Sequence, residues 1–416
     1  SGTVTKNETY AQVAREIFAY VLRDMTDSEG GFYSAEDADS EGVEGKFYVF
    51  SQSEVLATLG SEQGPLFCEI YGVSEAGNFR EEATGEQTGL NILHLEKAIP
   101  VVAAAKDLDP TVLKDLLRHM REKLLAARNE RVRPYRDDKI LTDWNGLMIS
   151  ALAYGSQVLA EPRYADAADR AASFLLEHLA RKDGRLLHRF RAGSAGILAH
   201  HDDYAFLCLG LMDLYESTLE ARWLNEAKRL AHDMIRLFWD EGEGGFFLSG
   251  ADAEHLITRT KEVYDGATPS GNSVATLVLL RLGHLLSDPE LEEKGGECLR
   301  VFSGRLARDP MAYPCMLTAL DFALGPRREV VLAGRKDNPA TMRLLRVIYG
   351  RFRPNTVLAF HPMGEKAREI EALIPYLKEQ TALRGEPAVY VCEGYTCKQP
   401  VTTVEELKKL LEPSPR

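Results

Sequence analysis

The sequence is poor in cysteine, in positive charge and in long apolar runs. Six cysteines in 416 residues are too few for a scaffold built on disulfides. Lys and Arg number 50 against 63 Asp and Glu, and the net charge of −13 argues against nucleic acid as a partner, because phosphate binding needs a concentrated basic surface. No apolar run approaches the roughly 20 residues that span a bilayer. We therefore expect a cytoplasmic globular protein with no membrane partner.

The cysteines do not predict a metal site. Cys392 and Cys397 are separated by four residues. Two thiolates without a second nearby pair do not complete a structural zinc site, which takes four ligands. Plain thiols or a disulfide are favoured over a metal, and no metal or cofactor is expected. The other cysteines lie in apolar helical patterns and are expected to be buried thiols: Cys68, Cys208, Cys298 and Cys315.

A motif of acidic, aromatic and amide residues recurs directly before three apolar helical segments. The motifs occupy residues 142–146, 200–204 and 264–272. Their aspartates Asp143, Asp202 and Asp265 follow one another at intervals of 59 and 63 residues. An interval of that length is too long for one helix and suits two helices with their turns.

The helical segments alternate between two kinds. Segment 143–159 is apolar almost all round and must be enclosed, whereas 163–181 has one polar and one apolar face. This alternation predicts a two-layer helical barrel, because a solenoid of helix pairs would not need one helix of each pair to be buried on all sides. The expected inner helices are 51–59, 143–159, 202–217, 270–286 and 311–324. The expected outer helices are 8–25, 109–128, 163–181, 221–239 and 289–307.

The composition changes after Gly325. Short apolar segments at 329–333, 356–360 and 388–392 predict strands, and 404–411 predicts a closing helix. We therefore predict a barrel domain, 1–325, and a small α/β segment, 326–416, packed on it. Because the chain begins with an outer helix, we expect the first inner helix of the barrel to lie outside this sequence.

A Gly-Gly-Phe turn occurs twice, at residues 29–33 and at 243–247. After the first turn comes an acidic stretch, 36–44, and then 46–50, whose composition is that of a strand. We predict a β-hairpin here. The acidic stretch lacks the spacing of a calcium-binding loop, and a solvated turn is the preferred interpretation.

Several of these motifs together resemble one family. They are Glu-Gly-Gly-Phe-Tyr-Ser-Ala-Glu-Asp-Ala-Asp-Ser-Glu-Gly at 29–42, Thr-Asp-Trp-Asn-Gly at 142–146, Asp-Asp-Tyr-Ala at 202–205, Asp-Gly-Ala-Thr-Pro-Ser at 265–270 and Tyr-Val-Cys at 390–392. Over essentially its whole length the chain resembles the YyaL-type, spermatogenesis-associated, thioredoxin-domain-containing proteins. The resemblance implies a mainly α fold, an (α/α)6 toroid of the six-hairpin glycosidase type that is incomplete here at its N-terminus. It also implies an upstream thioredoxin-like domain, so the missing N-terminal part of the same protein is an expected partner.

In such a barrel the loops before the inner helices converge at one end. Cleavage of a glycosidic bond needs one protonated and one ionised carboxyl group. The candidate catalytic residues are Asp143, Asp203, Asp265 and His201. The candidate substrate-binding residues are Trp144, Asn145, Asp202, Tyr204, Tyr264 and Asn272. The adjacent pair Asp202 and Asp203 is informative, because only one of them can cap a helix and two neighbouring carboxylates are costly unless something uses them.

Three hypotheses stay open. The first is a carbohydrate-active enzyme, a glycoside hydrolase with Asp143 and Asp203 as the acid/base pair. The second is a sugar epimerase that moves protons through His200 or His201. The third is a non-catalytic binding or scaffold barrel that serves the thioredoxin-like domain. The expected ligand is a small molecule or an oligosaccharide. A structural explanation competes with all three hypotheses. Asp, Ser and Asn before a helix are common N-caps, and each cap stabilises its helix by about 1 kcal/mol.

Overall fold

The computed structural model describes residues 7–80, 84–254, 257–394 and 396–412. These residues form two compact units. The first comprises the chain up to Ser34 and from Asp138 onward, and the second is Ala35–Asp137. Among the residues described, no helix is both long enough and apolar enough to cross a membrane.

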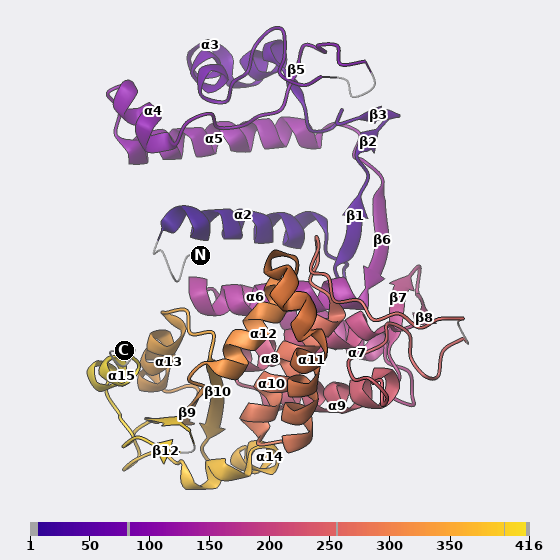
Figure 1. Cartoon of the computed structure of the whole chain (residues 1–416). Coiled ribbons are helices and arrows are strands. Elements are labelled where there is room, and N and C mark those ends of the chain that lie inside the picture. Colours follow the sequence, from indigo (N-terminus) through magenta and orange to yellow (C-terminus); the bar gives the residue numbers. More distant parts are fainter. Residues whose placement is uncertain (1–6, 81–83, 255–256, 395, 413–416) are drawn as a thin grey trace. The chain divides into compact units, whose positions relative to one another are not determined.

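In the first unit, two sets of helices, inner and outer, alternate along the chain (Figure 1). The inner helices are α6 (Thr142–Leu159), α8 (His201–Thr218), α10 (Gly271–Leu286) and α12 (Pro314–Leu324). Helices α8 and α10 are enclosed as predicted, whereas α6 and α12 are each exposed along one side, with Trp144, Tyr154 and Leu324 accessible. The outer helices are α2 (Glu8–Asp24), α7 (Pro162–His178), α9 (Ala221–Phe238) and α11 (Pro289–Arg308). Helix α8 packs on α6 and α10, α10 packs on α12, and α7, α9 and α11 each pack on the inner helix that precedes them. The predicted mainly helical (α/α) fold is confirmed.

Glycines allow the inner helices to approach one another closely. A Cβ atom on Gly146 would lie 2.5 Å from the backbone of Phe206, and one on Gly210 would lie 2.6 Å from the carbonyl oxygen of Gly146. Helices α6 and α8 are therefore in backbone contact. Outer helix α9 buries one face only, with Trp223 and Leu224 nearly inaccessible, which follows from its alternating polar and apolar faces.

A short β-bridge follows each of the outer helices α2, α7 and α9. The bridges join Thr26 to Phe32, Ala180 to Leu186, and Trp239 to Phe246. The two Gly-Gly-Phe turns predicted from the sequence lie in the first and the third bridge. The bridge after α7 has no Gly-Gly-Phe sequence, so this third copy of the turn was not recognised.

A hairpin that was not predicted from the sequence precedes α8. Strand β7 (Leu187–Arg191) pairs with β8 (Ser194–Leu198) and, on its other side, with β6 (Arg136–Leu141). Ala192 and Gly193 between β7 and β8 have φ values of 50° and 75°, the left-handed pair that a tight hairpin turn requires.

The second unit has a hydrophobic core of its own. Helix α3 (Gln52–Ile70), which kinks at Gly60, and α4 (Ile99–Ala105) pack on α5 (Pro110–Asn129). Val55, Phe67, Leu113 and Leu117 lie in this core. The helices predicted at 51–59 and 109–128 thus form. Their predicted places as an inner and an outer helix of the barrel were wrong, because they pack on each other in a core of their own.

The predicted hairpin at 36–50 forms in a different register. Strand β2 (Asp39–Ser40) pairs with β3 (Val43–Glu44), and residues 45–48 are a turn where a strand was expected at 46–50. Gly45 has a φ of 70°, and its carbonyl oxygen accepts bonds from the N–H groups of Tyr48 and Val49. Arg131 then donates to three carbonyl oxygens of this turn. The residues after it form β4 (Phe50–Ser51), which pairs with β5 (Leu90–Asn91).

The three strands predicted after Gly325 are present. They are β9 (Arg328–Gly334), β10 (Thr356–Pro362) and β11 (Ala388–Glu393), in the order β10-β9-β11-β12 with β12 at Thr396–Cys397. The helices of this segment are α13 (Pro339–Tyr349), α14 (Ala367–Leu373) and α15 (Val404–Leu410). Val331 and Val357 belong to the same hydrophobic core as the inner helices. The division into domains at 325/326 stays a prediction.

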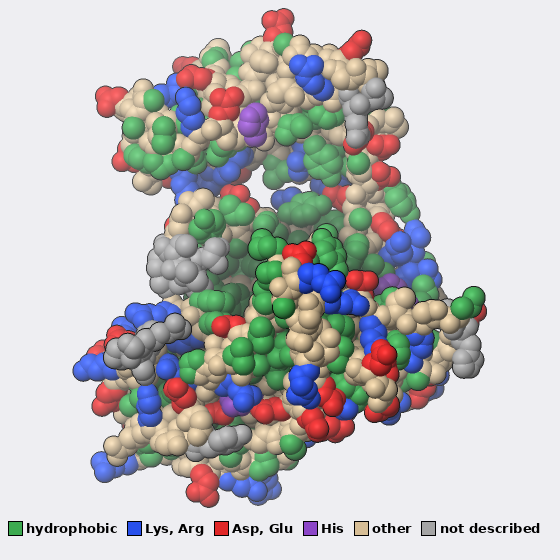
Figure 2. Space-filling view, viewed as in Figure 1, with side chains coloured by type: hydrophobic (Ala, Val, Ile, Leu, Met, Phe, Trp, Pro, Cys, Tyr) green, Lys and Arg blue, Asp and Glu red, His purple; other side chains and the backbone are tan. Residues whose placement is uncertain are grey.

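In Figure 2, basic and acidic side chains are interspersed over the lower part of the face shown.

Candidate functional site

Aspartates link the N-terminal ends of the inner helices. Asp203 on α8 accepts a hydrogen bond from the backbone N–H of Asp143 on α6, at 3.0 Å. Asp265 accepts bonds from Cys315 N and Met316 N at the start of α12, at 2.8 and 3.3 Å. Each carboxylate thus lies at a helix N-terminus, where the partial positive charge favours an anion. Both groups therefore cap a neighbouring helix, and Asp203 also caps its own helix through His200 N.

Asp203 is fully buried and serves as an anchor. Its oxygens lie 2.9 and 3.0 Å from His188 Nδ1, and Oδ2 accepts a bond from His200 N at 2.7 Å. Burial raises the pKa of Asp203 to about 6, although the bond to His188 opposes the rise. We expected Asp203 to exchange protons with a ligand, but its contacts point instead to holding His188.

His188 was not singled out in the sequence. It lies on β7, and 21% of its side chain is exposed. The hydrogen bond to Asp203 raises the pKa of His188, although burial opposes this. Because Nδ1 faces Asp203, Nε2 is the atom available for proton exchange. The sequence feature that could have identified His188 is its position as an isolated histidine in the strand just before the second motif.

His200 lies against His188. The two ring centroids are 5.2 Å apart, and 43% of the His200 side chain is exposed. Burial, together with the positive charge of His188, lowers the pKa of His200. The two imidazoles are therefore shifted in opposite directions, an arrangement that favours one protonated and one neutral ring.

Asp202 is the partly exposed carboxyl group with the most strongly shifted pKa in the cluster of Asp143, His188, His200, Asp202 and Asp203. One third of its side chain is accessible. Burial, and then repulsion from Asp203 and Asp143, raises its pKa to about 7. The carboxyl group lies against Gly271 at the start of α10, and a Cβ atom there would overlap Asp202 Oδ1. Glycine at 271 is therefore needed for this placement.

Asp143 is half-buried in the first turn of α6. Its Oδ1 accepts a bond from Trp144 N at 2.7 Å. Burial raises the pKa of Asp143, and the Trp144 N–H and the nearby His188 oppose the rise. Asp143 and Asp202 are thus the two carboxyl groups of the cluster that are both shifted and partly accessible.

His201 and Asp265, two predicted catalytic residues, make structural contacts. His201 is 1% exposed and stacks on Phe246, with ring centroids 4.7 Å apart. Burial lowers its pKa to about 3, so the ring is neutral near pH 7. Asp265 is 9% exposed, and besides capping α12 it accepts a bond from Ser270 N. The geometry adds no support for a catalytic role of either residue.

Three predicted binding residues hold the turns that follow the outer helices. Asn145 accepts from Phe32 N and donates to Phe32 O, at 2.7 and 2.9 Å. Asn272 makes the same pair of bonds with Phe246, at 2.8 and 2.9 Å. In the middle repeat the hydroxyl of Tyr204 accepts from Leu186 N at 3.0 Å. All three side chains are buried, and contact with a ligand stays a prediction for them.

Two aromatic rings of the motifs are exposed. Trp144 is 45% and Tyr264 is 59% accessible. Flat apolar faces of this kind are suited to stacking against a sugar ring. Both were predicted to bind substrate, and that role stays a prediction.

His188, His200 and Asp203 also present ligand atoms within 4.8 Å of one another. Two imidazoles and a carboxylate can bind zinc or iron. In this structure, however, both oxygens of Asp203 already accept N–H bonds from the backbone or from His188. A metal would have to displace these bonds, so the donor set fits an ion poorly.

The chain is similar to spermatogenesis-associated protein 20. It is 36% identical to the Homo sapiens protein and 34% identical to the Rattus norvegicus protein, over 98% of this chain in both cases. The chain spans about half the length of these curated relatives, 55% of each. No family model matches the chain.

Comparison with solved structures finds sugar-active enzymes at low similarity. A sugar epimerase from a ruminal bacterium has a TM-score of 0.35 and 13% identity, with 70% of each chain covered. A family 105 glycoside hydrolase of C. acetobutylicum has a TM-score of 0.34 and 14% identity, with 49% of this chain and 60% of that one covered. At these values the likeness bears on neither substrate nor chemistry.

Proposed function

We propose that the cluster at the N-terminal ends of α6 and α8 is an acid–base site for a carbohydrate, and that its reaction is hydrolysis of a glycosidic bond. The observation that carries the proposal is Asp202, a partly exposed carboxyl group with a pKa of about 7 beside a second partly accessible carboxyl group, Asp143. Glycoside hydrolysis needs such a pair in unequal environments.

In this proposal Asp202 is the acid. Near neutral pH a large fraction of its carboxyl group carries a proton, which it donates to the leaving glycosidic oxygen. Asp143 is assigned as the ionised partner. Burial raises the pKa of Asp143, and the Trp144 N–H and the positive charge of His188 oppose that rise by stabilising the carboxylate. Asp203 keeps His188 in place, so its contribution is to positioning. Trp144 and Tyr264 supply the apolar faces for the sugar.

The test is a panel of oligosaccharides assayed for release of reducing ends. Asp202→Asn and Asp143→Asn are each expected to lower kcat by about 10²–10⁴-fold, the usual contribution of a general acid or base. Asp166→Asn, an exposed change on α7, is the control and should leave the rate unchanged. Equal rates for all four proteins would overturn the assignment.

The opposed shifts of His188 and His200 favour a second candidate, sugar epimerisation. The centroids of the two rings are 5.2 Å apart. The neutral imidazole can take a proton from a substrate carbon, and the protonated one can donate a proton to it. An epimerase would incorporate deuterium from D₂O at the epimerised carbon without releasing reducing ends, and His200→Ala would abolish this exchange. Saturable binding without either reaction would support a binding barrel that serves a thioredoxin-like domain.

Metal dependence separates this proposal from a metal-assisted reaction. Because the oxygens of Asp203 are occupied by N–H donors, we expect the activity to survive dialysis against a chelator. Loss of activity on chelation, with recovery on adding zinc, would assign His188, His200 and Asp203 to a metal instead.

A further inference from the structure

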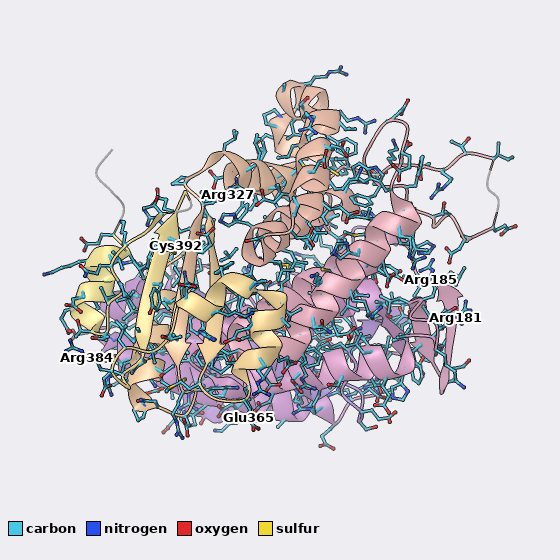
Figure 3. The ribbon with its side chains drawn as sticks, turned by 90° about the horizontal axis from the view of Figure 1, so that it is seen from below. Arg181, Arg185, Arg327, Glu365, Arg384 and Cys392 are labelled. Atoms are coloured by element: carbon cyan, nitrogen blue, oxygen red, sulfur yellow. A yellow bond between two sulfur atoms is a disulfide. The ribbon has the colours of Figure 1, made fainter. Side chains whose placement is uncertain are left out.

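A cavity lies where the C-terminal ends of the inner helices meet the C-terminal α/β segment. Its volume is about 300 Å³, at the lower end of the roughly 300–1,000 Å³ of small-molecule sites. Helices α6, α8 and α10 supply one wall, and α13 and β10 supply the other. Helix α13 packs on α6, and β10 packs on α10. Figure 3 shows the C-terminal segment, with Cys392 on one of its strands, beside the helices of this unit.

This cavity is separate from the site at the N-terminal ends of the same helices. Asp213 on α8 lines the cavity and is 11 residues beyond Asp202. At the rise of an α-helix this is about 16 Å along α8. A ligand the size of one sugar ring in the cavity therefore leaves Asp202 untouched.

The acidic groups of the lining are paired within the protein. Arg281 on α10 donates to Asp213 at 3.2 Å and to Glu216 at 3.0 Å. The other oxygen of Asp213 accepts a bond from the hydroxyl of Ser150 at 2.6 Å. No more than 16% of each of the three charged side chains is exposed. One guanidinium between two carboxylates leaves one excess negative charge, and burial, which raises the pKa of Glu216 against the effect of Arg281, reduces this excess.

The two remaining cations of the lining have no acidic partner. Arg351 and Arg353 flank Phe352 in the loop between α13 and β10. Within the part of the chain that the structure describes, neither forms an ion pair with a carboxylate, whereas Arg328 at the start of β9 does. Burial, and then the positive charges of Arg351 and Arg328, lower the pKa of Arg353. The lining thus has an excess of positive charge, which an anionic ligand would balance.

Arg353 has a structural role that leaves part of its guanidinium free. Its Nη1 donates to the carbonyl oxygen of Ile348 at 2.7 Å, near the end of α13. Its other bonds to described residues, to the carbonyl oxygens of Val347 and Arg351 at 3.5 Å, also come from Nη1. The planar guanidinium group has two further nitrogens, Nε and Nη2, that can donate to a carboxylate or a phosphate.

Aromatic and neutral polar side chains complete the lining. Tyr154 on α6 is 44% accessible and Phe352 is 54% accessible. Gln157 on α6 and Thr318 on α12 add an amide and a hydroxyl group. Flat apolar faces next to such polar groups suit a sugar ring, which has apolar faces and hydroxyl groups around its edge.

We propose that this cavity binds a monosaccharide that carries an anionic group, either a carboxylate or a phosphate. Arg351 and Arg353 hold the anion by charge-assisted hydrogen bonds. Tyr154 and Phe352 contact the ring, and Gln157 bonds to its hydroxyl groups. Binding here requires no reaction at Asp202.

The experiment is isothermal titration calorimetry on the intact chain with four ligands. Glucuronate and glucose 6-phosphate are sugar anions, glucose is the neutral sugar, and benzoate is an anion without hydroxyl groups. We expect at least one sugar anion to bind about tenfold more tightly than glucose or benzoate, because hydrogen bonds to charged groups contribute at least that much. The tighter of the two identifies the anionic group. Its affinity should fall as the salt concentration rises from about 0.05 to about 0.5 M.

A matched pair of variants tests where the anion binds. Arg351→Gln removes one charge from the lining and should weaken binding of the sugar anion about tenfold. Arg343→Gln removes the same charge from an exposed position on α13 outside the lining and should leave the affinity unchanged. Should Arg351→Gln fail to fold, the ligand series and its salt dependence in the wild type still decide. No binding of either sugar anion, equal affinity for glucose or benzoate, or equal affinities of the two variants would each overturn the proposal.

Discussion

Asp202 is an acid whose surroundings oppose its ionisation. Its pKa of about 7 lies above the ordinary value of 3.8, so the folded state binds the proton more tightly than the unfolded state does. The stability that results is fully present below pH 4 and is lost as the pH rises through 7. At pH 8 the ionised carboxylate therefore destabilises the fold.

We expect Asp202→Asn to raise the free energy of unfolding at pH 8 and to leave it nearly unchanged at pH 4. The gain should be about 1–2 kcal/mol, well below the value for the full shift, because one third of the side chain is exposed and solvent screens it. Urea unfolding at the two pH values measures the change, with Asp166→Asn as the control. A gain that is equal at both pH values would contradict the argument.

The pair His188–Asp203 gives a second prediction at this scale. The bond to Asp203 raises the pKa of His188, so Asp203→Asn should lower that pKa. The amide nitrogen of Asn would also face one of the two backbone donors, Asp143 N or His200 N, which costs about 1–3 kcal/mol of stability. Titration of the imidazole by NMR measures the pKa, and an unchanged value would show that Asp203 does not set it.

At the scale of elements, the inner helices α6, α8 and α10 are each joined to the turn that follows an outer helix by one side chain near the start of the inner helix. Asn145 and Asn272 satisfy both backbone groups of a phenylalanine, and Tyr204 satisfies the N–H of Leu186. These contacts explain why the Gly-Gly-Phe turns recur. The turn brings its backbone to a fixed point on the helix, where an amide can make two bonds.

We expect Asn272→Ala to destabilise the fold by about 2–4 kcal/mol, because it leaves the buried N–H and C=O of Phe246 unpaired. Tyr204→Phe should cost less, about 1–2 kcal/mol, since the bond to one buried N–H is its main loss at the turn. Asn225→Ala, exposed on α9, is the control. Chemical denaturation measures the loss of stability, and a larger loss for Tyr204→Phe than for Asn272→Ala would contradict this account.

At the scale of the whole molecule, the chain divides into two units with separate cores. Units with separate cores unfold in separate steps when the contacts between them are weaker than those within them. The three tryptophans of the sequence, Trp144, Trp223 and Trp239, all belong to the first unit. Tryptophan fluorescence therefore reports on that unit alone, whereas far-ultraviolet circular dichroism reports on both.

We expect the two signals to give different unfolding curves. Leu117→Ala in the core of the second unit should shift the dichroism curve and leave the fluorescence curve in place. Leu211→Ala in α8 should shift the fluorescence curve, and either change should cost about 2–5 kcal/mol. Coincident curves for the wild type and for both variants would mean that the two units unfold together.

The sequence by itself determined the elements. The two-sided pattern of 163–181 predicted the half-buried helix α7, and the apolar patterns of the second and third motifs predicted the enclosed helices α8 and α10. The prediction that 143–159 is enclosed was wrong, because α6 leaves Trp144 and Tyr154 exposed. The strands after Gly325 followed in the same way from runs of apolar residues. The sequence also placed carboxylates before the inner helices, because the same local pattern recurred three times. Such features depend on neighbours in the chain, where periodicity and capping act.

Only the tertiary structure decided what each polar residue does. Asp203 and Asp202 are adjacent in the chain, yet one is fully buried against His188 and the other lies partly open beside Gly271. Asn145 bonds to the backbone of Phe32, a partner that its position in the sequence did not indicate. The physical reason is that a carboxyl or amide group takes its role from its solvation and its donors. Those donors come from residues as much as 113 positions away in the chain.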